Sequence, residues 1–427
     1  MRVTKSKLYY PPFGGENHIT VVYDANQGAF IPPEFRPSTA ENWINYTILP
    51  ITESSAEFGF TLEPNNGTTT RTATVTFNDD MSGGSISITI IQVSVIKPIW
   101  ADFKYLAGAS VGQNYPYKIK MGDDIIYEGV SVPAANEIPE SINVSRIVES
   151  YVSSYDFGSI PGDNYFFDLG CIAVDFYTVS GDTETYRDTF MFTNDWSGYV
   201  TGYSNIDKIL NDPINHKGCS QMKFPLCYYN ATDKVWTLVN QTSTQTYTSI
   251  FPTNNYPFGI CNKTFVSTNT QTLSFKCGDD VMVTYDLQHC GNGALYYRNR
   301  FGGWDGYLLE GNIKKSEKYT KQQFTSNGEN TKSSSWGTKT DKNSIVTSYE
   351  TTTGWLSDEE SDRFVYHLLS SPTVYFQPFE ADPHRLGDMI SVNITNTTAE
   401  YKKFKNGRNL VKYTITFDES KTKQICR

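Results

Sequence analysis

The feature that most constrains the fold is a strict alternation of apolar and polar residues near the N-terminus. Residues 71–77 place Ala73, Val75 and Phe77 at every second position, and residues 85–90 do the same with isoleucine. Successive side chains of a β-strand point to opposite faces of a sheet, so this period marks a strand with one buried face. A helix would scatter the same residues around its surface. We therefore expect strands here.

Segments of the same kind recur along residues 1–97. Turn-forming stretches such as Pro64–Gly67 and Asp79–Gly84 separate them, at a spacing of about ten residues. Short strands at this spacing predict a two-sheet, immunoglobulin-like β-sandwich. The expected strands are Ile19–Tyr23, Ile44–Leu49, Phe58–Leu62, Arg71–Phe77 and Ser85–Ile90.

The composition of the whole chain favours strands as well. Of the 427 residues, 14% are aromatic and 19% are charged. Aromatic and β-branched side chains suit pleated sheets, and so few charges are atypical of a disordered chain. We predict a mainly β protein, in which the N-terminal sandwich is followed by two further β-rich domains with a few short helices. The expected domains are residues 1–97, 98–215 and 216–427.

Several local signals fill in these domains. Turns at Met121–Asp124 and Ser180–Asp182 predict two hairpins, and the Asn406–Gly407 pair predicts a third between Lys402 and Phe417. Short helices are expected from Pro139, with Ile147, Tyr151 and Val152 on one face, and over Ser204–Leu210. Strands are expected at Val281–Tyr285 and Leu295–Arg298.

The strongest helix signal covers residues 357–371. Ser357 followed by Glu360 forms a capping-box pattern, and Pro372 comes directly after the segment. Acidic residues in the first turn suit the positive end of the helix dipole. The expected buried stripe is Phe364, Val365, Leu368 and Leu369.

Residues 321–353 form a long polar stretch, rich in Ser, Thr, Asn and Lys. A compact domain seldom carries so long a polar stretch unless it is an extended hairpin or an arm. Two interpretations stay open. One is a mobile surface loop, and the other is a projecting arm that becomes ordered on a neighbouring subunit.

The N-terminal unit resembles a BACON domain. The resemblance rests on Trp43 before a short strand, Asn65 before a turn, the strand Arg71–Val75, and the closing strand Ile88–Gln92. It implies an immunoglobulin-like sandwich of a kind common in Bacteroidetes and their phages. The family's small-residue segment near the early tryptophan is replaced here by the proline-rich stretch Ile31–Pro37.

The cysteines favour buried thiols over a disulfide framework. The chain has seven, an odd number, and none forms a C-x-x-C pair that would suggest a zinc ribbon. The basic N-terminus is not followed by an apolar core of signal-peptide length, so we expect folding in a cytosol, where thiols stay reduced. Five cysteines cluster in one region, namely Cys219, Cys227, Cys261, Cys277 and Cys290.

No pattern in the sequence assigns a catalytic, cofactor-binding or metal-ligating residue. Gly108–Gly112 matches the G-x-S-x-G motif, but Pro116 follows where that motif requires a helix. The scattered histidines have no metal-ligand spacing, and His367 is expected to pack beside the apolar helix stripe. The acidic pairs at residues 79–80, 123–124 and 279–280 lie in turns, which explains them without catalysis.

Two other features have both a structural and a functional interpretation. The basic runs at residues 314–321 and 402–412 are expected to be solvated strand faces, although they could meet acidic faces of neighbouring subunits. In the stretch Leu295–Tyr307, rich in aromatics and glycine, Tyr297, Trp304 and Tyr307 could stack on a sugar ring. We favour a core hairpin there. The stretch also resembles one in tail-associated structural proteins of Bacteroides phages.

The net charge of −10 argues against general nucleic-acid binding. No apolar run approaches the roughly 20 residues of a membrane-spanning helix. A BACON-like module without a signal peptide fits a virion protein better than a secreted bacterial one. The resemblance therefore implies a non-enzymatic structural protein of a crAss-like phage tail, assembled in the host cytoplasm. It would form a ring, collar or baseplate-like layer with copies of itself, other tail proteins and tail fibres.

The alternative function is that of a surface carbohydrate-binding or carbohydrate-active protein with an accessory BACON module. It predicts an exposed aromatic platform. A third possibility, a virion depolymerase, would need two carboxylates facing each other across a cleft, at a separation of about 5–10 Å.

Overall fold

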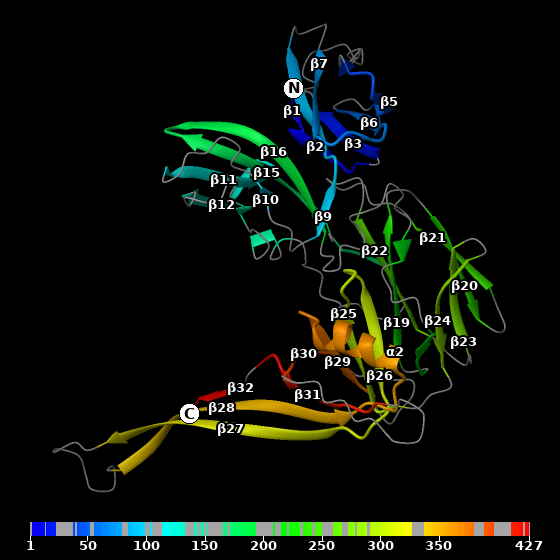
Figure 1. The fold of residues 1–427 in the computed structure, drawn as a ribbon, viewed down its shortest axis with the longest axis vertical. Helices are drawn as coiled ribbons and strands as arrows, with labels where there is room; N and C mark the ends of the chain where they lie inside the picture. The colour runs from blue at the N-terminus through cyan, green and yellow to red at the C-terminus, as the bar shows by residue number, and fades with distance from the viewer. Residues whose placement is uncertain are drawn as a thin grey trace.

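A computed structural model shows a chain built mainly of β-strands, arranged in several sheets (Figure 1). The mainly β prediction is therefore confirmed. None of the helical segments in the described part of the chain has the length and apolar character needed to cross a membrane. The structure describes residues 2–12, 14–22, 37–38, 41–51, 55–78, 84–98, 103–104, 113–132, 141–142, 147–148, 151, 165–168, 171–193, 208–209, 215–219, 222–230, 234–240, 244–249, 259–266, 272–277, 280–287, 291–326, 337–379, 388–396, 411–421 and 423–426.

The N-terminal residues form the expected two-sheet sandwich. Its core lies between the sheets, where Phe58, Phe60 and Phe77 are buried and the rings of Phe58 and Phe77 lie 5.0 Å apart. One four-stranded sheet has the order β1 (Arg2–Val3), β3 (Gly15–Val22), β6 (Ser55–Leu62) and β5 (Ile44–Ile51). The other has the order β2 (Lys7–Tyr10), β8 (Ser85–Gln92), β7 (Arg71–Asn78) and β4 (Pro37–Ser38).

Strand β2 was not anticipated from the sequence. It pairs in parallel with β8, and its side chains Leu8 and Tyr10 are fully buried in the sandwich core. A four-residue strand shows too little periodicity to be recognised locally, and its partner lies far along the chain. The basic N-terminus is therefore part of the sandwich.

The residues that carried the BACON resemblance converge at one end of the sandwich. Buried Gln92 donates to the carbonyl oxygens of Pro11 and Glu63, at 3.1 and 3.0 Å, and accepts from Nε of Arg71 at 2.7 Å. The Arg71 guanidinium lies over the ring of Trp43, 4.3 Å from its centroid. This network satisfies backbone groups that the strand ladders leave unpaired.

Asn65 closes the same end from the turn before β7. Its Nδ2 donates to the carbonyl of Thr69 at 3.0 Å, and its Oδ1 accepts from the amide of Gly67 at 3.1 Å. Its own amide donates to the carbonyl of Pro12 at 2.5 Å. These BACON-like residues therefore hold the fold together.

The second region is a five-stranded sheet. Its two hairpins were predicted, and their turns use Gly122 and Gly181, whose φ angles of +65° and +58° favour glycine. The strand order is β12 (Asp124–Ser131), β11 (Tyr115–Met121), β15 (Cys171–Ser180), β16 (Thr183–Thr193) and β9 (Ile96–Pro98). Because β9 follows β8 after only residues 93–95, the chain passes directly from the sandwich into this sheet.

Two helix predictions in this region are wrong in part. Ser141–Ile142 is strand β13, which pairs with β10 (Phe103–Lys104), whereas Ile147, Val148 and Tyr151 are helical among the described residues. Lys208–Ile209 is strand β17, although a helix was expected there. Pairing with strands distant in sequence outweighed the weak local preference of these short segments.

The chain then forms three further sheets. Strand β14 (Tyr165–Asp168) pairs with β22 (Gly259–Val266), so this four-stranded sheet joins residues on both sides of the expected boundary at residue 216; it also contains β19 (Lys223–Asn230) and β17. A five-stranded sheet has the order β18 (Asn215–Lys217), β24 (Asp280–Asp286), β23 (Thr272–Cys277), β20 (Lys234–Asn240) and β21 (Thr244–Ser249). An eight-stranded sheet has the order β26 (Trp304–Leu309), β25 (Gly293–Arg298), β29 (Val374–Pro378), β30 (Ile390–Ile394), β31 (Thr414–Glu419), β28 (Gly337–Thr352) and β27 (Lys314–Ser326), with β32 (Lys423–Cys426) beside β28.

The predicted capped helix is present and packs on the eight-stranded sheet. Ser357 and Glu360 form the expected capping box, and helix α2 covers Asp358–Arg363. The chain then widens into the π-helical segment η3, Phe364–Leu369, which sequence did not predict. Phe364 and Leu368 are buried in the core, as expected from the apolar stripe.

The polar stretch forms a long hairpin. Strands β27 and β28 pair from Lys314–Glu350 out to Ser326–Gly337. The hairpin projects from the body of the chain, on the far side from the N-terminal sandwich (Figure 1). Of the two interpretations left open, the structure supports an extended arm.

The third predicted hairpin can be followed only in part, because its turn at residues 402–410 lies outside the described residues.

We predict that Gln92→Met will loosen the closed end of the sandwich. The substitution keeps the side-chain volume but leaves the carbonyls of Pro11 and Glu63 and the Arg71 guanidinium without this partner. Such losses cost about 1–3 kcal/mol. Hydrogen–deuterium exchange of amides in β2 and β8 of the full chain measures this cost. Thr74→Val, at an exposed position of β7, should change it by less than about 0.5 kcal/mol, and equal effects of the two variants would contradict the assignment.

Candidate functional site

Several candidates from the sequence lie outside the described residues. These are the motif at 108–112, the acidic pair at 79–80, Asp279, the histidines at 289 and 384, Cys290, and the basic run from 402 to 408. Cys219 and Cys227 are buried thiols without a disulfide, as expected. The side chains of Cys261 and Cys277 are not described.

The described histidines occupy three unrelated places. His18 on β3 lies 3.7 Å from a carboxylate oxygen of Glu16 and 3.6 Å from one of Glu57. His216 stacks on Tyr285 with ring centroids 5.0 Å apart, and His367 is buried on η3, as predicted. Within the described residues, no group of three His, Cys, Asp or Glu side chains could hold a metal ion.

The aromatic stretch at residues 295–307 is a core hairpin, as we favoured. Tyr297 and Trp304 are buried, and Tyr307 packs partly buried against the same core. The Trp304 amide donates to Sγ of Cys227 at 3.1 Å, which ties β26 to β19. The rings are therefore not available for stacking on a sugar. Asp123 and Asp124 likewise lie at a hairpin turn, as expected.

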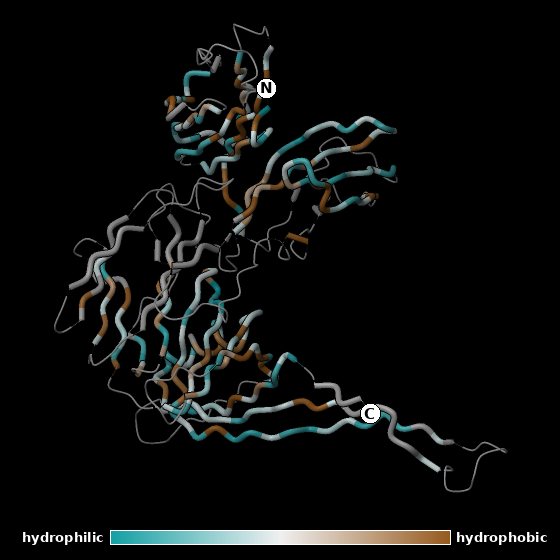
Figure 2. Tube along the Cα trace, turned by 180° about the vertical axis from the view of Figure 1, so that it is seen from behind, coloured by the Kyte–Doolittle hydropathy of each residue, from teal (hydrophilic) through white to brown (hydrophobic). Residues whose placement is uncertain are grey.

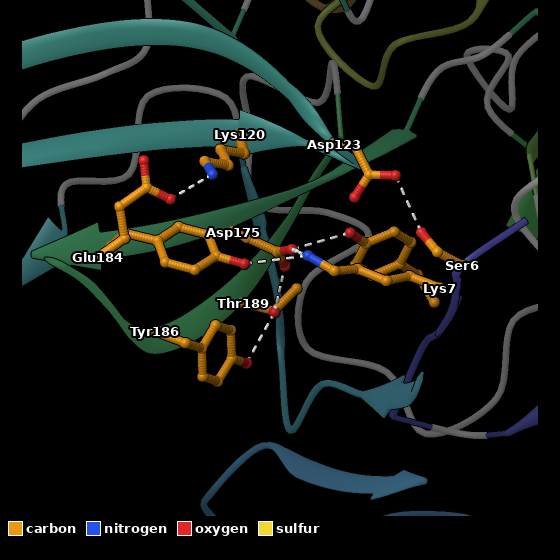
Figure 3. A network of polar contacts seen from close by, with 10 residues as sticks. Ser6, Lys7, Lys120, Asp123, Asp175, Glu184, Tyr186 and Thr189 are labelled. Carbon is orange, nitrogen blue, oxygen red and sulfur yellow. Dashed lines mark hydrogen bonds and ion pairs between the residues drawn. The ribbon is translucent and has the colours of Figure 1, made fainter. Parts of the chain in front are cut away.

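A buried carboxylate joins the N-terminal sandwich to the five-stranded sheet (Figure 3). Asp175 on β15 is fully buried, forms an ion pair with Lys7 of β2, and accepts a 3.0 Å hydrogen bond from the Tyr9 hydroxyl. Thr189 on β16 donates to its other oxygen at 2.6 Å, and Lys7 also donates to the Tyr177 hydroxyl at 3.0 Å. A charged residue within the apolar run of β15 was the sequence signal for this junction, and we did not recognise it.

The contacts at the junction favour the charged form of Lys7. Burial by itself lowers the pKa of the Lys7 ammonium, but the contacts with Asp175, and then with Tyr177, outweigh it and raise the pKa above its ordinary value. A raised lysine pKa gives stability that is fully present below the ordinary lysine value and is lost only as the pH rises through the raised one. The Lys7 ammonium therefore still contributes this stability at neutral pH.

The edge strand β12 exposes an apolar surface. Three apolar residues of the strand, Ile125, Tyr127 and Val130, are exposed, and so is Val132 just after it. Their exposed fractions lie between 39% and 59%. Acidic residues lie beside them, with Asp124 at the start of the strand and Glu128 within it. An open edge with exposed apolar side chains is a ready template for another strand. We call this surface the β12 edge.

The arm, β27 with β28, has the opposite character. All described side chains from Lys314 to Gln323 are exposed, and Tyr319 is 58% exposed. Figure 2 shows β27 as hydrophilic along most of its length. Residues 312–353 contain seven lysines and four acidic residues, whereas the whole chain contains 36 basic and 46 acidic residues. Among the described strands, β27 stands at the end of its sheet, as β12 does in its own.

We predict that Lys7→Met will destabilise the junction by about 3 kcal/mol. The variant leaves Asp175 buried without its cation, and we take the lower end of the range for such losses because the Lys7 side chain keeps 18% exposure. The exchange protection of amides in β2 and β15 measures the loss.

Two further variants control this prediction. Lys7→Met combined with Asp175→Leu removes both charges and should recover most of the stability. Ser6→Ala removes only the exposed hydrogen bond to Asp123 and should have an effect below about 0.5 kcal/mol. Full protection in Lys7→Met alone would refute the role of this ion pair.

Comparison with solved structures finds only distant likenesses. The endo-fucoidan hydrolase MfFcnA4 from glycoside hydrolase family 107 is 12% identical, with 66% of this chain and 43% of that chain covered and a TM-score of 0.16. An ectodomain fragment of ICAM-5 is 8% identical, with 91% and 97% covered and a TM-score of 0.15. The chain thus spans less than half the length of the hydrolase, and TM-scores this low carry no argument about its function.

Comparison with protein families identifies one region. No curated protein matches the chain. Residues 36–93 match the family described as "BACON: Putative binding domain, N-terminal". The match contains Trp43, Asn65, Arg71 and Gln92, the residues that close the end of the sandwich. Residues 36–93 of this chain therefore form a BACON domain, within a sandwich that β1, β2 and β3 complete.

Proposed function

We propose that this chain is a structural component of a phage tail, which assembles through protein–protein contacts into a ring, collar or baseplate-like layer. The observation that carries the proposal is the presence of two open sheet edges of opposite character on one chain. One is the apolar and acidic β12 edge, and the other is the lysine-rich arm.

The exposed arm can gain buried surface by docking on another protein. A strand of 13 residues extends for about 40 Å. Beyond the pairing of β28 with β32, where Gln323–Ser326 face Gly337–Thr340, the described part of the arm is a two-stranded hairpin, and such hairpins without a packed face are marginally stable in water. The described side chains of β27 are exposed. Docking on a neighbour would supply the missing burial. The lysines discourage pairing between two arms, since like charges would then meet, and favour an acidic surface.

The β12 edge of a second copy offers such a surface. It presents a strand at the end of its sheet among the described strands, exposed apolar side chains that Tyr319 could cover, and the carboxylates of Asp124 and Glu128, of which Glu128 also pairs with Lys118 at 3.1 Å. The arm and the edge belong to different parts of the chain, so the contact is head-to-tail. A head-to-tail contact closes into a ring when the rotation between copies permits.

The BACON domain and its junction suit a rigid part of such a layer. The Lys7–Asp175 pair and the short connection at residues 93–95 hold the sandwich against the five-stranded sheet. The BACON domain would lie at the periphery as a docking point for tail fibres or other tail proteins. Its resemblance to phage modules, together with that of residues 295–307, is the basis for placing the protein in a tail, assembled in the host cytoplasm.

A surface carbohydrate-binding protein is the second candidate, because the BACON family is described as a binding domain. Trp43 cannot serve as a stacking platform, since its ring is 7% exposed and is covered by Arg71. Tyr297 and Trp304 are buried as well. A glycan array would test this candidate, and strong selective binding by a monomeric chain would favour it over assembly.

We predict that the purified chain forms a closed oligomer whose mass is a multiple of 48.2 kDa in size-exclusion chromatography with light scattering. An arm variant with Lys314→Glu, Lys315→Glu, Lys318→Glu and Lys321→Glu should stay monomeric, because its carboxylates would face those of the β12 edge. An edge variant with Asp124→Lys and Glu128→Lys should also stay monomeric. Replacing the same four lysines by arginine should leave assembly intact.

Mixing the two charge-reversed variants provides the decisive control. The acidic arm of the arm variant can then bind the basic edge of the edge variant. The basic arm of the edge variant can bind the unchanged acidic edge of the arm variant, so mixed oligomers should form. A wild-type chain that stays monomeric at every concentration would contradict the assembly proposal. Absence of the chain from purified phage particles, measured by mass spectrometry, would contradict its place in the tail.

A further inference from the structure

A pocket with basic walls lies between the loop that follows β25 and the π-helical segment η3. Its volume is about 200 Å³. A water molecule takes roughly 30 Å³ of liquid, so the pocket holds several waters or one small ligand. Its lining includes Arg298, Asn299, Arg300, Tyr366 and His367.

A tight loop fixes the two arginines on either side of Asn299. The Asn299 amide donates to the carbonyl of Gly303 at 2.9 Å, and its side-chain oxygen accepts from the amides of Phe301 and Gly303 at 2.9 and 3.1 Å. Gly302 has a φ of +91°, which favours glycine at this position of the loop. The loop is therefore held in one shape before any ligand arrives.

The pocket has a buried floor and an exposed rim. Arg298 and His367 are 2% and 3% exposed, so they form the floor, whereas Arg300 and Tyr366 are exposed at the rim. Aromatic contacts orient these groups. The Arg298 guanidinium lies 5.3 Å from the Trp304 ring centroid, the Arg300 guanidinium 5.1 Å from that of Phe301, and the Phe301 and His367 rings lie 5.2 Å apart.

The charge of the lining contrasts with the acidic chain around it. Arg298, Arg300 and His367 are among the lining residues, and none of the described lining residues is acidic. The nearest carboxylate along the loop, Asp305, is fully buried and accepts from Nδ2 of Asn299 at 2.7 Å. A guanidinium presents several donors in a planar fork that matches the oxygens of sulfate and phosphate.

The helix side adds an independent observation. Tyr366 and His367 come from η3, and π-helical turns are rare and found frequently at functional sites. The wider turn changes the direction of side chains relative to an α-helix. Here it follows directly on α2 and supplies two of the residues that line the pocket.

We propose that this pocket binds a small oxyanion, sulfate or phosphate, either free or as the ester group of a small molecule. Arg298 supplies charge from the floor, and Arg300 closes on the anion from the rim. The proposal is independent of the proposed assembly, because the pocket involves neither the arm nor the β12 edge.

The test is isothermal titration calorimetry of the full chain with sodium sulfate and with inorganic phosphate, at constant ionic strength set by sodium chloride. We expect saturable binding of one anion per chain. Arg300→Gln, at an exposed position, should weaken it by about tenfold or more, since a charged hydrogen bond is lost. Lys412→Gln removes one exposed charge outside the pocket and should leave the affinity unchanged.

One further variant and two further ligands test the proposal more sharply. Arg298→Lys keeps the charge but loses the planar fork, so it should also weaken binding. Glucose 6-phosphate and galactose 6-sulfate identify the source of the anion, because tighter binding than that of the free ion would assign an ester, and equal binding a free ion. Absence of saturable binding, or equal weakening by Arg300→Gln and Lys412→Gln, would overturn the proposal.

Discussion

Backbone groups at the ends and edges of β-sheets must find partners, because burial removes the water that would otherwise satisfy them. In this chain, side chains bind the free backbone groups at one end of the N-terminal sandwich, and sheet edges are either extended by a further strand or left at the end of a sheet. Gln92 and Asn65 bind carbonyl oxygens at one end of the N-terminal sandwich, and β9 extends the second sheet by parallel pairing. Within the part of the chain that the structure describes, β12 and β27 each stand at the end of a sheet. The proposed assembly follows from those two strands.

The same reasoning explains why the BACON signature gives little information about ligand binding in this protein. Its most distinctive side chains form one network that includes backbone carbonyls, a guanidinium and a buried tryptophan ring. Residues committed to such a network cannot also face a ligand. The chain offers a lysine-rich arm, an exposed edge and a basic pocket in separate regions, and the proposed functions lie there.

The junction at Asp175 holds the N-terminal sandwich and the five-stranded sheet in a fixed relation. A fully buried carboxylate is stable only when it is paired and hydrogen-bonded, and Lys7, Tyr9 and Thr189 supply those contacts from both sides of the junction. Because the partners come from the sandwich and from the sheet, neither unit can move away without exposing or orphaning a charge. A layer built from repeated copies benefits from such a rigid joint.

The sequence by itself determined the elements whose signals are local. Alternation predicted the strands of the sandwich, glycine turns predicted the hairpins at residues 115–131 and 171–193, and Ser357 with Glu360 predicted the helix cap. Tertiary structure decided everything that depends on distant partners. The short strands β2, β13 and β17 exist because of the strands they pair with, Asp175 is meaningful only beside Lys7, and Arg298 meets His367 only after folding. Local periodicity records which face of a segment is buried, but the energy of a pairing or an ion pair depends on residues far along the chain.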